Sequence, residues 1–300
     1  MVAGLAGALA IAFSAIFVRL SEASPSTAAV FRCAYAVPIL IALAAWETRR
    51  YGPRPRRDRL IGAGAGVLFA IDLVFWHHSI ANVGAGLATV LGNLQVLLVA
   101  FGAWAVLGER PGRRLVAAIP VVLTGAVMIS GVFESGAYGK DPALGAIYGL
   151  LTTIAYAGFL LVLRQVNRDV RRPAGPLLDA TASSAVVAAL SGVVVGDLDL
   201  VPSWPGHGWL LLLAVSSQVV GWLLISVSLP RLPAALTSVL LLVQPATTVL
   251  LAFVILGERP SALQLAGVAV VLAGVCLATV VLPSRAPRER SAEPLPARAP

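Results

Sequence analysis

The sequence predicts an all-α membrane protein whose ten transmembrane helices form two inverted five-helix repeats. Three observations predict this fold: long uncharged apolar segments, an uneven distribution of Arg among the loops, and a sequence block that occurs twice. Apolar residues make up 58% of the 300 positions and charged residues only 12%, whereas a soluble domain carries roughly a quarter charged residues. The shortage of charge excludes an ordinary soluble fold.

Clusters of Gly, Pro and charged residues divide the chain into ten apolar segments. A helix needs about 20 apolar residues to cross ~30 Å of hydrocarbon, and these segments are close to that length. They are continuous apolar runs, unlike the ~10-residue alternating strands of a membrane β-barrel. An open strand would also leave its backbone groups unpaired in lipid. The predicted helical spans are 2–18, 27–46, 60–80, 84–107, 114–133, 143–163, 176–197, 207–228, 233–256 and 262–282.

The positions of Arg and Lys predict the orientation of these spans. Cytoplasmic loops of membrane proteins carry an excess of both residues. With the N-terminus in the cytoplasm, eighteen of the twenty-two basic residues fall in cytoplasmic loops or in the tail 283–300. The outer loops keep only Arg19, Lys140 and Arg259, and Arg32 lies within the second span. We therefore expect a multi-pass protein of the cell membrane with both termini in the cytoplasm.

Composition also bears on partners and source. The net charge of +8 is explained by the basic loops, so we expect a lipid bilayer as the partner and no nucleic acid. Cys33 and Cys276 both lie in apolar spans and have no zinc-type spacing, so no metal or other cofactor is expected. The tail 283–300, rich in Pro, Arg, Ala and Glu, is predicted to be disordered. The excess of Arg over Lys is typical of a GC-rich bacterial genome.

An internal repeat is the strongest indication of the architecture. The block Leu107-Gly-Glu-Arg-Pro111 recurs as Leu256-Gly-Glu-Arg-Pro260, shifted by 149 residues. An ungapped alignment of 87–130 with 236–279 gives fifteen identities in forty-four positions. Such self-similarity indicates duplication, with one copy in residues 1–138 and the other in 139–282. Because each copy holds five spans, an odd number, the second copy must cross the membrane in the opposite direction.

Inverted repeats are typical of secondary transporters, which bind their substrate near the bilayer midplane between the two halves. The ten-span layout and the block that closes spans four and nine resemble EamA-type members of the drug/metabolite transporter superfamily. The resemblance covers residues 1–282 and implies carriage, often export, of amino acids, other metabolites or drugs. Family members often have Pro near the middle of the helix that carries the block. Pro245 matches this pattern in the second half, whereas Val96 replaces Pro in the first half.

Few ionisable residues lie inside predicted spans, where charges are costly and usually face a cavity or a partner, and Arg32 and Asp72 are among them. At 1.5 Å per residue, Arg32 lies about 8 Å and Asp72 about 12 Å below the outer surface. Because they occupy adjacent spans at similar depth, a salt bridge between them is geometrically possible. The pair can hold spans two and three together, can bind the two charges of a zwitterion, or can couple transport to protons through titration of Asp72.

Further polar and aromatic residues are candidates for lining the substrate site. Trp76 lies one turn beyond Asp72 on the same helix face, and His77 and His78 are expected in an outer vestibule. Gln95 and Gln244 are equivalent in the two halves and fall ~16 Å into their spans, near the bilayer centre. They are expected either to contact substrate or to join helices by hydrogen bonds. Weaker candidates are Asn93, Gln218, Trp222, Tyr148 and Tyr156.

The predicted function is a secondary transporter, more specifically an exporter, of small metabolites such as amino acids. It would work by alternating access between the two halves. An intramembrane enzyme or a lipid-handling protein is the alternative class. Such an enzyme needs convergent catalytic groups, and Asp72 has no second carboxylate at its depth. No Walker-type phosphate loop is present to bind ATP. The sequence does not specify the solute, the coupling ion or the oligomeric state.

Overall fold

The computed structural model of the protein describes residues 2–99, 113–228 and 234–279, and in these ranges the regular structure is helical. The tail 283–300 and the block 107–111 lie outside the described residues. The helices are α1 (Val2–Ala12), α2 (Ser14–Ser21), α3 (Pro25–Tyr51), α4 (Arg56–Val83), α5 (Ala85–Gly92), α7 (Arg113–Ile129), α8 (Pro142–Val166), α9 (Ala174–Val195), α10 (Gly206–Leu213), the π-helix η1 (Ala214–Gly221), α11 (Trp222–Ser228), α12 (Ala234–Leu256) and α13 (Ala262–Thr279).

The described helices agree in length and composition with a membrane protein. Six helical segments are long and apolar enough to cross a bilayer, with α1–α2 and α10–η1–α11 each counted as one. Four shorter apolar helices accompany them, at residues 85–99, 116–129, 243–256 and 262–278. The prediction of an all-α membrane protein is therefore confirmed.

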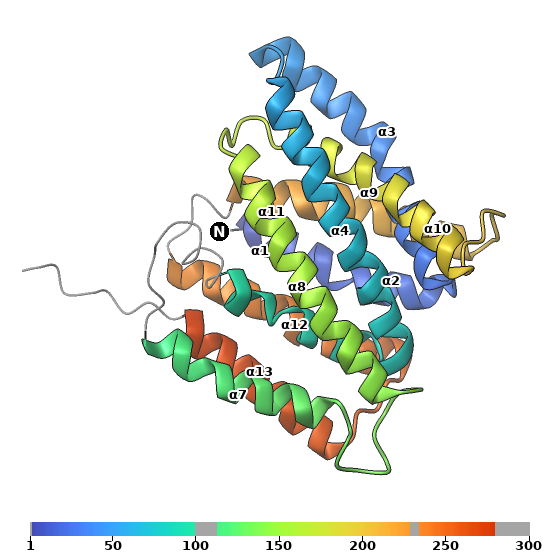
Figure 1. The fold of residues 1–300 in the computed structure, drawn as a ribbon, viewed down its shortest axis with the longest axis vertical. Coiled ribbons are helices and arrows are strands. Elements are labelled where there is room, and N and C mark those ends of the chain that lie inside the picture. The colour runs from blue at the N-terminus through green and yellow to red at the C-terminus, as the bar shows by residue number, and fades with distance from the viewer. Residues whose placement is uncertain (1, 100–112, 229–233, 280–300) are drawn as a thin grey trace, which may run out of the picture.

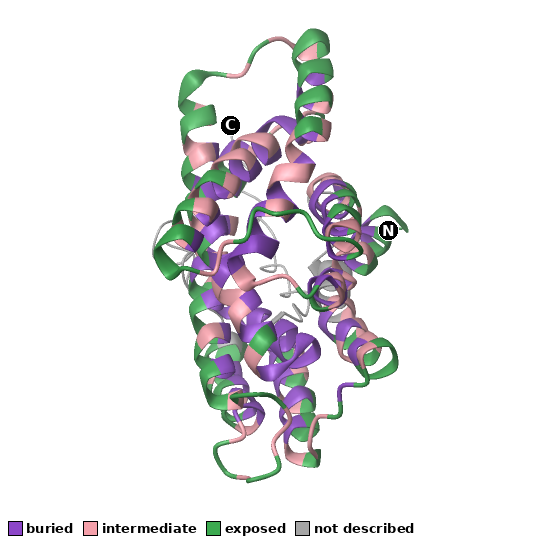
Figure 2. Ribbon diagram, turned by 90° about the vertical axis from the view of Figure 1, so that its right-hand side faces the viewer, coloured by how far each residue is buried: buried purple, intermediate pink, exposed green. Residues whose placement is uncertain are grey.

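The outer surface of the helix bundle is strongly apolar. Figure 2 shows buried residues on the inward faces of the helices and exposed residues on the outward faces. Many of the exposed residues are large and aliphatic or aromatic, among them Ile154, Leu190, Val194 and Phe253, each more than half exposed. Water would not stabilise so wide an apolar surface. These faces are suited to contact with lipid chains.

Helices α3 and α9 pack antiparallel and cap one another at both ends. At one end, the buried Glu47 carboxylate accepts hydrogen bonds from the backbone N–H groups of Ala174 (2.9 Å) and Gly175 (3.0 Å). At the other end, the Asp197 carboxylate accepts from the N–H of Ser26 at 3.2 Å. Each acid lies at the C-terminal end of one helix and satisfies free N–H groups at the N-terminus of the other.

Replacing Glu47 with Ala is expected to destabilise this pair of helices. The substitution leaves the buried N–H groups of Ala174 and Gly175 without an acceptor, which costs about 1–3 kcal/mol. The thermal unfolding midpoint of the detergent-solubilised protein measures the effect. Arg49→Ala, on an exposed side chain half a turn away, is the control. Equal midpoints for the two variants would show that the Glu47 cap contributes nothing.

A second carboxylate cap joins α12 to α5. Glu258 follows α12, is almost fully buried, and accepts from the N–H groups of Ala85 (2.7 Å) and Gly86 (3.1 Å) at the start of α5. Burial raises the pKa of Glu258, and these two N–H groups and the positive charge of Arg19 act in the opposite direction. The Glu of the second repeated block is thus a structural cap in this structure.

Helices α7 and α13 lie side by side and antiparallel, as Figure 1 shows near its lower edge. Small residues allow their backbones to touch. A methyl group added at Gly125 would lie 2.8 Å from the carbonyl oxygen of Gly267, and the reverse addition gives the same distance. Gly274 lies against Val122 in the same way. Such close approach of glycine-containing helices is a common basis of packing in membranes.

Helix α4 is the central element, because it packs along both α8 and α9. Ser79 donates to the carbonyl of Gly145 on α8 at 2.7 Å. On the other side, Ser184 of α9 donates to the carbonyl of Gly66, also at 2.7 Å. These hydroxyl-to-carbonyl bonds fix the position of α4 between its neighbours, so that its middle third faces the interior.

Candidate functional site

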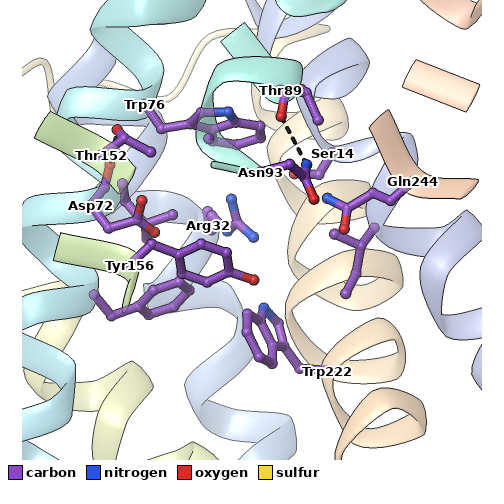
Figure 3. A pocket seen from close by; sticks show the side chains of 14 residues that line it. Ser14, Arg32, Asp72, Trp76, Thr89, Asn93, Thr152, Tyr156, Trp222 and Gln244 are labelled. Atoms are coloured by element: carbon purple, nitrogen blue, oxygen red, sulfur yellow. Dashed lines mark hydrogen bonds between the residues drawn. The ribbon is translucent and has the colours of Figure 1, made fainter. Parts of the chain in front are cut away.

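A cavity lies in the middle of the helix bundle. Figure 3 shows its polar and aromatic side chains converging from several helices. Its lining residues come from α1, α2, α3, α4, α5, α8, α11 and α12, together with the turn after α5. They are Ile11, Ser14, Arg32, Phe69, Asp72, Leu73, Trp76, Thr89, Gly92, Asn93, Thr152, Tyr156, Trp222 and Gln244.

Three of the lining segments lose regular α-helical geometry at the level of the cavity. The predicted first span divides into α1 and α2 at Phe13, next to the cavity residue Ser14. The predicted fourth span is interrupted by a turn at 93–94, where Leu94 bonds back to Leu91. The predicted eighth span contains the π-helix η1 directly before Trp222. Irregular backbone is tolerated in a membrane protein where it faces a cavity, and π-helical turns are frequent at functional sites.

Arg32 is the cation of the cavity. It extends from α3, its exposed fraction is 3%, and its Nε donates to Oε1 of Gln218 on η1 at 2.9 Å. The Gln218 amide nitrogen in turn donates to Thr181 of α9 at 3.0 Å. The guanidinium carbon lies 5.8 Å from the centre of the Phe69 ring and 5.7 Å from that of Trp76, within the range of cation–π attraction.

Asp72 is the anion of the cavity, with an exposed fraction of 5%. The salt bridge with Arg32, which the sequence allowed, is not formed: no nitrogen of Arg32 lies within 4.0 Å of the Asp72 carboxylate. The reason is that Gln218, from a span distant in sequence, binds the Nε of Arg32. The backbone oxygen of Asp72 accepts from Thr152 of α8 at 3.2 Å. Both charges thus face the same cavity without neutralising each other in a direct pair.

Aromatic side chains form one wall of the cavity. Trp222 makes edge-to-face contacts with Phe69 (5.9 Å between ring centres) and Tyr156 (6.2 Å). The ring of Phe159 stacks on Phe69 at 4.4 Å behind them. These contacts hold the rings in fixed orientations. The buried indole nitrogen of Trp222 has no hydrogen-bond partner, which leaves one donor beside the cavity.

The two matched glutamines do not occupy equivalent places. Gln244 lines the cavity, as Asn93 does, whereas Gln95 is buried and does not line it. The turn at 93–94 places Asn93 at the cavity in the first half, where its amide donates to Thr89 at 2.8 Å. Helix α12 continues through Pro245 as one helix. The helix is therefore interrupted in the predicted first half, which has Val96 at the position that matches Pro245.

The two histidines lie outside the central cavity. His77 is buried, its Nδ1 lies 3.0 Å from the carbonyl oxygen of Pro25, and it borders a separate recess with Arg19 and Glu22. His78 is half-buried and stacks on Tyr148 of α8 at 5.1 Å. Neither contacts Asp72 directly, and a vestibule role for them stays a prediction.

Sequence reasoning did not identify two lining residues with clear polar roles. Ser14 is buried and its hydroxyl has no hydrogen-bond partner. Thr152 connects α8 to the backbone of Asp72. Both residue types are common in membrane helices, where a hydroxyl usually bonds to its own helix backbone. In the sequence, the two residues are marked only by their position near the middle of an apolar span. Many other Ser and Thr residues share this position, so it does not single them out.

The fold and the site together define a multi-pass membrane protein with a central cavity lined by one cationic and one anionic side chain. Residues 1–131 and 143–280 match the EamA-like transporter family. The chain therefore belongs to this family, whose members are transporters, and the predicted resemblance is confirmed. At the level of the family, this makes the chain a transport protein and not an enzyme.

Relatives and solved structures agree with this assignment. Over 102 residues the chain is 30% identical to the "Pseudopaline exporter CntI" of two strains of Pseudomonas aeruginosa, UCBPP-PA14 and PAO1. The match covers 34% of this chain and only 34% of each exporter. A solved structure described as "Crystal structure of protein" shares the fold, with a TM-score of 0.63 at 17% identity. That likeness covers 93% of this chain and 95% of the solved one.

Proposed function

We propose that the protein is a secondary transporter that exports small metabolites such as amino acids by alternating access between two inverted halves. The central cavity is the observation that carries the proposal. It holds one buried cation, Arg32, and one buried anion, Asp72, that are not directly paired. Both charges remain available, and their sum is zero. A zwitterionic solute could pair its negative group with Arg32 and its positive group with Asp72.

The number of spans is proposed to be ten. The six long and four shorter apolar helices supply ten segments in the order that the sequence predicts. The halves 1–138 and 139–282 then hold five segments each. Both halves contribute to the cavity, the second through Thr152, Tyr156, Trp222 and Gln244. A site built between the two halves is typical of transporters with internal repeats.

The inverted relation of the halves is supported by the packing of matched helices. At the shift of 149 residues, α7 corresponds to α13 and the fourth span to α12. The contacts of Gly125 with Gly267 and of Val122 with Gly274 run in opposite directions along α7 and α13. In the same way, α5 begins at the end of α12. Cross-contacts also recur in both halves, because α1 packs on α12 as α8 packs on α5.

Export out of the cell is supported by the name of one relative, since the protein that this chain matches over a third of its length is named as an exporter. The membrane is proposed to be the inner membrane of a bacterium, because the distribution of Arg predicts that both termini lie in the cytoplasm. The driving force is proposed to be the proton gradient, with Asp72 as the group that binds and releases the proton, because it is the carboxylate of the cavity.

Flux measurements in proteoliposomes test this function. Liposomes loaded with a high concentration of one unlabelled amino acid and containing purified protein are expected to accumulate the labelled form transiently by exchange. Repeating the assay for the twenty common amino acids identifies the preferred solute. Protein-free liposomes are the control. If no amino acid exchanges faster than in protein-free liposomes, amino-acid transport is excluded.

A further inference from the structure

We propose that Arg32, Ser14 and Trp222 form a site for the carboxylate group of the transported solute, and that Gln218 is the residue that positions Arg32. This inference rests on the proposed transport of amino acids. It adds an orientation of the solute in the cavity, with the carboxylate group at Arg32. The four side chains belong to different helices: Arg32 (α3), Ser14 (α2) and Trp222 (α11) line the cavity, and Gln218 lies behind Arg32 on η1.

The first support is the geometry of Arg32. Its Nε is occupied by Gln218 at 2.9 Å, and the Phe69 and Trp76 rings lie against the guanidinium group. These contacts use the inner edge of the group and restrain its rotation. The terminal nitrogens Nη1 and Nη2 remain, and Figure 3 shows the end of the Arg32 side chain among the side chains that line the cavity. A guanidinium edge of this kind binds a carboxylate through two parallel hydrogen bonds.

The second support is a pair of buried donors without partners. The hydroxyl of Ser14 and the indole N–H of Trp222 are both buried, with exposed fractions of 1% and 5% for the residues, and neither makes a hydrogen bond. Leaving such groups unpaired costs about 1–3 kcal/mol each. Both line the same cavity as Arg32. Together with Nη1 and Nη2 they give four donors, which is about the number that one carboxylate can accept.

Charge selects a carboxylate over a phosphate. Arg32 is the cation that lines the cavity, and Asp72 lines it too, so that the described lining residues have no net charge. A doubly charged phosphate would be repelled by Asp72 and only half neutralised by Arg32. A single carboxylate is neutralised, and the ammonium group of the same solute can approach Asp72. The aromatic wall of Tyr156 and Trp222 then faces the apolar part of the solute.

Gln218 acts through Arg32 and does not need to touch the solute. Its amide is fixed from both ends, because its oxygen accepts from Arg32 and its nitrogen donates to Thr181 at 3.0 Å. Gln218 is fully buried and does not line the cavity. Its place on the π-helix η1 directs the side chain toward α3 and α9. Without this amide, Arg32 is free to turn toward Asp72.

The test compares an amino acid with its own amide, which lacks only the carboxylate. The preferred amino acid from the exchange assay and its carboxamide compete for exchange in proteoliposomes. For the unmodified protein, we expect the amide to compete at least ~10-fold more weakly, because hydrogen bonds to charged groups are the strongest of their kind. Arg32→Lys keeps the charge but not the two-pronged geometry, and is expected to remove most of this preference.

Two variants test the other donors. Trp222→Phe keeps an aromatic ring but removes the indole N–H together with part of the ring system, and is expected to weaken binding of the acid more than binding of the amide. Trp46→Phe, on an exposed Trp of α3, is its matched control. Gln218→Met is expected to reduce the preference for acid over amide while changing the melting temperature of the protein only slightly. A purely structural role of Gln218 would lower the melting temperature and leave the preference intact.

The outcomes separate this inference from the proposed function. If no amino acid exchanges at all, the proposed function fails and the carboxylate site fails with it. If exchange occurs but acid and amide compete equally in the unmodified protein, transport stands and the carboxylate site is refuted. Retention of the full preference in both Arg32→Lys and Trp222→Phe would also refute it.

Discussion

Replacing Gly66 with Ala is expected to destabilise the protein by more than any other single methyl group added along α4. A methyl group at this position would lie 2.1 Å from the carbonyl oxygen of Ala180 and 1.9 Å from the hydroxyl of Ser183. The Ser183 side chain can rotate away, but the backbone carbonyl of Ala180 cannot. Helices α4 and α9 must therefore separate.

Separation of the two helices would break more than one contact. The hydroxyl of Ser184 donates to the carbonyl of Gly66, and that of Ser183 donates to the carbonyl of Ala63, both at 2.7 Å. Overpacking of a well-packed interior costs typically 1–3 kcal/mol, and weaker hydrogen bonds add to this cost. We expect a total of about 3 kcal/mol, measured as a lower melting temperature of the purified protein in detergent.

The chain itself offers a close control. Gly64 lies two residues away on the same helix, is exposed, and has no atom within 4 Å of an added methyl group. Gly64→Ala is expected to be neutral or to stabilise the helix by about 0.5–1 kcal/mol, since Ala has the higher helix propensity. If the two variants melt at the same temperature, then α4 and α9 are not in the close contact described here.

The apolar segments and their helical nature could be predicted from the sequence because both follow from local composition. The lipid interior requires long apolar runs with satisfied backbone groups, and such runs are readable without knowledge of the neighbouring chain. The family could likewise be identified, because the repeated Leu-Gly-Glu-Arg-Pro block preserves charged and proline residues at fixed positions. Asp72, Arg32, Trp76, Asn93, Trp222 and Gln244 were all predicted and all line the cavity.

The irregular helices could not be predicted, because they depend on contacts between segments distant in sequence. Nothing in the residues 214–221 marks them as a π-helix, and Gln218 takes its role only through Arg32 and Thr181. Pro245 lies inside the continuous helix α12, whereas the interruption lies at residues 93–94, where no proline is present. Local propensity is overruled here by packing around the cavity.

The Arg32–Asp72 salt bridge, which the sequence allowed as one possibility, is absent for a related reason. Depth along a helix can be counted from sequence, but the direction in which a long side chain turns depends on all its partners. In the structure Arg32 turns toward Gln218 and two aromatic rings. A direct pair would hold the two charges together, whereas in the structure no nitrogen of Arg32 lies within 4.0 Å of the Asp72 carboxylate, the group proposed to bind the proton.

Proton-driven transport is therefore expected to be lost in Asp72→Asn. Asn has nearly the same size and polarity but does not titrate in the physiological range. A carrier that uses a proton gradient to accumulate solute must bind a proton on one side of the membrane and release it on the other. With Asn at this position, accumulation driven by an imposed pH gradient should fall at least ~10-fold, a loss of coupling and not of folding.

Exchange of solute for solute separates this effect from a loss of binding. During exchange the binding site holds solute each time it changes from one side of the membrane to the other. No net movement of protons is therefore required. Asp72→Asn is thus expected to keep measurable exchange while losing accumulation driven by the pH gradient. Asp58→Asn, in the first turn of the same helix and outside the cavity, should keep both activities. Normal gradient-driven accumulation by Asp72→Asn would show that another group carries the proton. Proton-driven transport would then not require the titratable carboxylate of the cavity.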